Sequence, residues 1–63
     1  MKTADDWEAA YRRATEDEAR AAEAAEDHVA RHGVRDIVLE ESLLEASKAR
    51  RETFFAMPRL AAE

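Results

Sequence analysis

The most restrictive feature of this sequence is that one glycine, Gly33, and one proline, Pro58, are its only strong helix breakers. The two stretches that they delimit, residues 4–32 and 34–57, are rich in alanine, glutamate, arginine and leucine, which favour helices. Glycine readily adopts the left-handed conformation that ends a helix, and the residue before a proline is biased out of the helical region. The sequence therefore predicts two helices joined at Gly33.

Apolar residues recur along the first stretch with the period of an α-helix. Thr3 can cap the helix N-terminus, and the aspartates that follow it suit the positive end of the helix dipole. Counted from Trp7 at 100° per residue, one stripe holds alanine, aromatic, histidine and valine side chains and a single carboxylate, Glu18. We predict an amphipathic helix over residues 4–32.

The second helix is predicted over residues 35–57 and is apolar on two sides. Ten of the chain's 14 apolar residues larger than alanine lie from Val34 onward, and they form two arcs on the helix. One arc consists of Leu39, Leu43, Ala46, Phe54 and Met57, and the other of Val34, Ile37, Leu44 and Phe55. A helix with two apolar arcs needs two neighbours, and the sequence leaves open which arc meets the first helix.

The predicted fold is all-α, a single domain over residues 1–63 that forms an antiparallel two-helix hairpin with a turn at Gly33 and a short tail over 58–63. Folding back at Gly33 places residue i opposite roughly residue 66 minus i. This register pairs Val29 with Ile37, Ala22 with Leu44, Tyr11 with Phe55, and Glu18 with Lys48, with Arg51 one turn away. Because so short a chain buries little surface alone, we expect it to pair into a four-helix bundle or to dock on a partner.

Candidate partner-binding residues lie along the second helix and at the open end of the hairpin. Aromatic residues and methionine are typical anchors of protein interfaces. The candidates are Trp7, Tyr11, Leu39, Leu43, Phe54, Phe55, Met57 and Leu60. The leading hypothesis is a non-enzymatic protein–protein interaction module, acting as an assembly factor, accessory subunit or small regulator. Its partner would be a second copy, with a dimer favoured, or another protein.

The sequence predicts no catalytic residue, cofactor or metal site. Ser42 and Ser47 lie within a helix with no glycine-rich turn nearby, and the chain has no cysteine. His28 and His32 are four residues apart, which can place two imidazoles on one helix face, but no Glu-x-x-His or His-Glu-x-x-His motif accompanies them. A metal- or pH-responsive bundle that uses these two histidines is therefore only a third hypothesis.

The charge balance argues against nucleic-acid binding. Fifteen acidic and ten basic residues give a net charge of −5, which repels phosphate in spite of the basic cluster Lys48, Arg50 and Arg51. An alternative hypothesis is an acidic, phage-type inhibitor that occupies a basic site on a nucleic-acid enzyme through Glu16, Asp17, Glu23, Glu26 and Asp27. The chain has no apolar run near 18 residues and begins with an acidic, polar segment, so we predict no membrane span and expect a cytoplasmic location.

Overall fold

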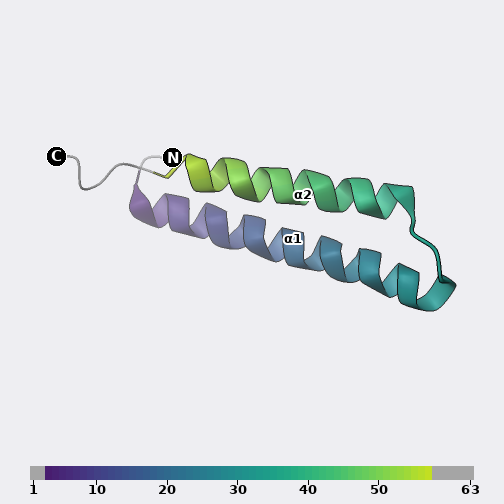
Figure 1. Ribbon diagram of the computed structural model, residues 1–63. Coiled ribbons are helices and arrows are strands. Elements are labelled where there is room, and N and C mark those ends of the chain that lie inside the picture. The colour runs from purple at the N-terminus through teal and green to yellow at the C-terminus, as the bar shows by residue number, and fades with distance from the viewer. Residues whose placement is uncertain (1–2, 58–63) are drawn as a thin grey trace.

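The computed structural model describes residues 3–57, which form two antiparallel helices (Figure 1). Helix α1 spans Ala4–His32 and helix α2 spans Ile37–Phe55. The two helices lie side by side, so that the start of α1 and the end of α2 are at the same end of the molecule (Figure 1). The predicted all-α hairpin is confirmed for these residues, and no strand occurs among them.

Both ends of α1 carry the caps that the sequence predicts. Thr3 Oγ1 accepts a hydrogen bond from the backbone N–H of Asp6 at 3.1 Å. At the other end, Gly33 adopts the left-handed conformation with φ 74°, and its N–H donates to the carbonyl oxygen of Val29 at 2.7 Å. These bonds satisfy backbone groups that the end of a helix leaves without partners, and they fix α1 over the predicted range.

Helix α2 is two residues shorter at each end than the predicted range 35–57. The Asp36 carboxylate accepts hydrogen bonds from the backbone N–H groups of Val38 at 2.8 Å and Leu39 at 3.2 Å. This cap makes Ile37 the first helical residue and leaves Asp36 itself in an extended conformation. The predicted tail, residues 58–63, lies outside the described residues.

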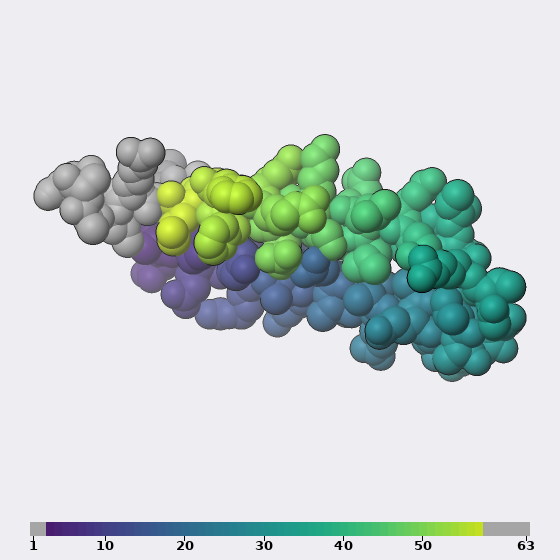
Figure 2. Space-filling model, viewed as in Figure 1, coloured from purple at the N-terminus to yellow at the C-terminus, as the bar shows by residue number. Residues whose placement is uncertain are grey.

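The hairpin is long and thin, with principal dimensions of 53 × 14 × 14 Å, and Figure 2 shows this outline from one side. Only Ala25 is buried among residues 3–57, at 4% exposure. Small alanine side chains along α1 allow the helices to approach, but two helices cannot enclose a core. As a result, eight larger apolar side chains are exposed: Val29, Val34, Ile37, Val38, Leu44, Phe54, Phe55 and Met57.

Helix α2 turns the arc that contains Leu39 and Leu43 toward α1, and these two leucines are half-buried. Two of the pairings expected with the other arc, those of Tyr11 and Ala22, are wrong by one residue on α2. Tyr11 contacts Phe54, not Phe55, with ring centroids 5.9 Å apart.

The pairings expected nearer the turn are also absent. Ala22 lines a groove with Leu43, whereas Leu44 is 69% exposed, and Ile37, expected opposite Val29, is 73% exposed. One residue along a helix changes the direction of the side chain by 100°. The expected register along the helix axes is close, but the expected rotation of α2 about its own axis is wrong.

Candidate interaction surfaces

Five of the seven half-buried residues of α2 recur at alternating spacings of four and three, which is the pattern of a helix packed against one neighbour. We call this row the inner seam, and it consists of Leu39, Leu43, Ala46, Arg50 and Thr53. Its leucines and alanine face the alanine-rich side of α1, where Leu43 shares a groove with Ala22 and Ala25. Arg50 is the only charged residue of the inner seam, and it requires a partner on α1.

That partner is Glu18, the one carboxylate in the apolar stripe of α1. Arg50 Nε lies 2.6 Å from Glu18 Oε1, in an ion pair that is not aligned as a hydrogen bond, and Ser47 Oγ donates to Glu18 Oε2 at 2.6 Å. The side chains of Glu18 and Arg50 are 25% and 30% exposed. Ser47 therefore takes the position expected for Lys48, and the cation one turn away is Arg50 and not the expected Arg51.

The surroundings of this pair shift both pKa values toward the charged forms. The hydrogen bond from Ser47, followed by the interactions with Arg50, lowers the pKa of the Glu18 carboxyl group. The hydroxyl of Tyr11 and the carboxylate of Glu18 raise the pKa of Arg50. The ion pair and the hydrogen bond from Ser47 tie the middle of α1 to α2.

Four rings form a continuous chain at the open end of the hairpin, and we call Trp7, Tyr11, Phe54 and Phe55 the aromatic cluster. Trp7 stacks on Tyr11 with centroids 5.2 Å apart, and Phe54 meets Phe55 edge to face at 5.6 Å. Trp7 Nε1 also donates a hydrogen bond to the carbonyl oxygen of Thr53 at 2.6 Å. The expected gathering of these four residues is present. Trp7 and Tyr11 contact α2 through the carbonyl oxygen of Thr53 and the ring of Phe54, and so join the two helices.

The other half of the aromatic cluster lies open. Phe54 is 45% exposed, Phe55 is 81% exposed, and the nearby Met57 is 51% exposed, whereas Trp7 and Tyr11 are half-buried. Leu60, the remaining candidate at this end, lies outside the described residues. The exposed apolar surface at the open end therefore comes from the C-terminal part of α2.

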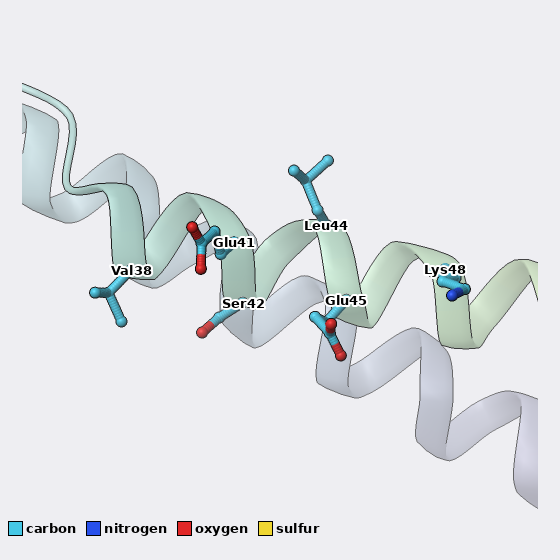
Figure 3. Close-up of a pocket in the computed structure, with 6 residues that line it drawn as sticks. All are labelled: Val38, Glu41, Ser42, Leu44, Glu45 and Lys48. Atoms are coloured by element: carbon cyan, nitrogen blue, oxygen red, sulfur yellow. The ribbon is translucent and has the colours of Figure 1, made fainter.

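A second row with the same alternating spacing runs along the other side of α2. We call it the outer seam, and it consists of Ile37, Glu41, Leu44, Lys48, Arg51 and Phe55, all of them exposed. Val38, which is 65% exposed, adjoins it. Figure 3 shows part of this side, where Leu44 points away from α1 and all the residues that line a shallow hollow belong to α2.

Of the candidate residues on α2, the structure places Leu39 and Leu43 on the inner seam and Phe55 on the outer seam. Sequence reasoning did not select Ile37, Val38 and Leu44, which are exposed in the hairpin. The number of charged residues on each row was the signal in the sequence that could have identified the exposed row. The outer seam carries three charged side chains and the inner seam one, and burial of a charge is costly unless it is paired.

The basic cluster does not form one patch. Arg50 faces Glu18 across the helix interface, whereas Lys48 and Arg51 are exposed on the outer seam. The rings of His28 and His32 lie together, with centroids 4.5 Å apart. Within the described part of the chain, no three potential ligands gather in a way that could hold a metal ion.

The acidic side of α1 is interleaved with arginines. Ion pairs one helical turn apart join Glu8 to Arg12, Asp17 to Arg20, and Asp27 to Arg31. Two of the five acidic residues considered for an inhibitor, Asp17 and Asp27, thus have a cation beside them. This side of α1 presents alternating charges and not a continuous acidic strip.

No protein-family model, curated protein or solved structure matches this chain. In the part of the chain that the structure describes, neither helix combines the length and the apolar character needed to cross a bilayer. Function must therefore be inferred from the two surfaces themselves, the outer seam and the exposed part of the aromatic cluster.

Proposed function

We propose that this chain is a non-enzymatic protein–protein interaction module that binds its partner through the outer seam of α2 and the adjoining exposed aromatic residues. One observation carries the proposal: three large apolar side chains of the outer seam, Ile37, Leu44 and Phe55, are 69–81% exposed. Complete burial of such a side chain contributes about 1.5–3 kcal/mol, so covering these three would provide roughly 3–7 kcal/mol toward binding.

The arrangement of polar groups also favours a binding role over catalysis. Glu18, Ser47 and Arg50 form the most tightly connected polar cluster, and they are held by contacts with one another between the helices. Hydrogen bonds to the ion pair, and the ion pair itself, shift the pKa values of Glu18 and Arg50 toward the charged forms, whereas general acid–base catalysis needs a group that exchanges its proton near neutral pH. This cluster supports the hairpin, which in turn presents the outer seam.

The open end of the hairpin extends the proposed surface. Phe55 belongs both to the outer seam and to the aromatic cluster, and Phe54 and Met57 lie exposed beside it. Aromatic residues and methionine contribute large apolar area and are frequent anchors of interfaces. A partner that covers the outer seam would reach these side chains without any rearrangement of the hairpin.

The test compares the wild-type chain with Leu44→Glu, in which a charge replaces an exposed apolar side chain of the outer seam. The purified proteins would be examined by sedimentation equilibrium, and affinity-tagged versions would be recovered from the source cells. We expect the wild type to form a stoichiometric complex, with itself or with another protein, and Leu44→Glu to lose it while keeping its helical content.

Ala24→Glu is the matched control, because Ala24 is exposed on α1 and its substitution also adds one negative charge in place of an apolar side chain. This variant should retain the complex. A wild-type chain that is a helical monomer at every concentration, and that recovers no stoichiometric partner from cells, would contradict the proposed function.

A further inference from the structure

We propose that the outer seam binds the outer seam of a second copy of this chain, with the two α2 helices antiparallel about a two-fold axis near Ala46. This inference rests on the proposed function, because it names the partner of the same surface. The observation behind it is the order of side chains along the outer seam. When two copies of this row run in opposite directions, apolar side chains face apolar ones and acidic side chains face basic ones.

The complementarity appears when two antiparallel α2 helices overlap over their whole length, Ile37–Phe55. Ile37 of one copy then lies opposite Phe55 of the other, which brings together side chains that are 73% and 81% exposed in the single hairpin. By the two-fold symmetry this apolar contact forms twice, once at each end of an interface about 28 Å long.

Opposite charges meet in the next layer of the same register. Glu41 lies opposite Arg51 of the second copy, and Arg51 lies opposite Glu41, so that two symmetry-related ion pairs form. Both residues are exposed in the hairpin. Such pairs contribute little as single surface contacts, but they discriminate strongly between arrangements that attract and arrangements that repel.

The central layers combine apolar and amphipathic side chains. Leu44, which is 69% exposed, lies opposite Lys48 of the second copy. The four-carbon stem of a lysine can cover an apolar neighbour while its ammonium group stays in water. The two Glu45 side chains flank the axis, and each has Lys48 of its own chain one helical turn away to offset their repulsion.

The same charges disfavour a parallel arrangement. Two parallel α2 helices in register place every residue of the outer seam beside its own copy, so that Glu41 meets Glu41, Lys48 meets Lys48 and Arg51 meets Arg51. Like charges that face each other destabilise an interface. The order of charges therefore selects the antiparallel pair, and α1 of each copy, packed on the inner seam, stays clear of the contact.

The test uses charge reversal at the paired positions, followed by sedimentation equilibrium. We expect the wild type to be a dimer, and Glu41→Lys and Arg51→Glu each to dimerise at least about tenfold more weakly, because each change turns two attractive pairs into repulsive ones. An equimolar mixture of the two single variants should recover the dimer, because Lys at 41 then faces Glu at 51 and Arg51 faces Glu41.

The single variants separate the two orientations, because in a parallel register each would only exchange one pair of like charges for another and would dimerise like the wild type. The double variant Glu41→Lys/Arg51→Glu should regain wild-type dimerisation in the antiparallel register, because opposite charges again face each other at positions 41 and 51. The control variants Glu23→Lys and Arg13→Glu change the charge of exposed positions on α1 by the same amounts and should leave dimerisation unchanged. Circular dichroism of each variant checks that the helices persist.

Several results would overturn this inference, and they differ in what they mean for the proposed function. A dimer that is unaffected by the single reversals, or that the double variant does not restore, would reject this register while self-association remained. A helical monomeric wild type that binds another protein, and loses it on Leu44→Glu, would reject the second copy as partner and retain the interaction module. A monomer with no partner at all would reject both.

Discussion

Removing only the indole N–H of Trp7 should destabilise the hairpin by about 1 kcal/mol. Trp7 Nε1 donates to the carbonyl oxygen of Thr53 at 2.6 Å and so joins the first turns of α1 to the last turn of α2. The same carbonyl oxygen accepts a second bond, from the N–H of Ala56 at 3.1 Å, so it keeps a partner when Trp7 no longer donates. The expected cost is therefore the net contribution of one hydrogen bond, about 0.5–1.5 kcal/mol, and not the larger penalty of a buried carbonyl group without a partner.

Replacement of the Trp7 side chain by its benzothiophene analogue, through chemical synthesis, substitutes sulfur for the N–H and keeps the ring shape that stacks on Tyr11. Thermal unfolding followed by far-UV circular dichroism, at equal protein concentrations, measures the loss. A change of 1 kcal/mol shifts the midpoint by about 4–8 °C in a domain of this size, so we expect a decrease of roughly 5 °C. A midpoint within about 1 °C of that of the synthetic wild type would refute the contribution assigned to this bond.

Three further predictions concern the caps and the ion pair. Gly33→Ala should lower stability by about 1–2 kcal/mol and Gly33→Asn by less. A Cβ at this position meets no atom within 4 Å, so the cost comes only from the positive φ of 74°, which asparagine tolerates better than alanine. Equal midpoints for the two variants in urea unfolding would contradict this. Asp36→Ala should lower the free energy of unfolding by about 0.5–2 kcal/mol and Asp36→Asn by much less, since asparagine retains an acceptor for the first turn of α2. Helical content measured against temperature would show whether the two variants differ. Contacts with Ser47 and Arg50 lower the pKa of Glu18 in the folded state, so its contribution to stability is complete above the unfolded-state pKa and is lost as the pH falls through the folded-state pKa. The thermal unfolding midpoint, measured between about pH 2 and 6, should therefore fall less steeply for Glu18→Gln than for the wild type. Superimposable profiles of the two proteins would count against the contribution of the pair.

The bounds of α1 could be predicted from the sequence because local chemistry determines them. Thr3 caps the start, Gly33 supplies the left-handed residue at the end, and neither depends on distant parts of the chain. The register along the axes was also nearly correct, because a tight turn after α1 constrains which residues face each other. This is why Tyr11 meets the last turn of α2 and Glu18 meets its middle.

The rotation of α2 about its own axis could not be predicted from the apolar pattern alone. Leu43 and Leu44 are chemically identical neighbours on different rows, and each row carries two or three large apolar side chains. The energetic difference between the two rotations comes from polar groups: with the inner seam packed on α1, Glu18 gains both Ser47 and Arg50 as partners. The count of charges on each row points to this preference, but its cause is pairing between helices, which a single helical wheel does not represent.

The contact between Trp7 and Thr53 has a practical consequence for how folding of this chain can be observed. The chain contains one tryptophan, and its indole touches a residue 46 positions away. Its fluorescence therefore reports on closure of the hairpin, whereas circular dichroism reports on helix content whether or not the helices are paired. Comparing the two signals through a single unfolding experiment would separate the formation of helices from their association, with no label added to the protein.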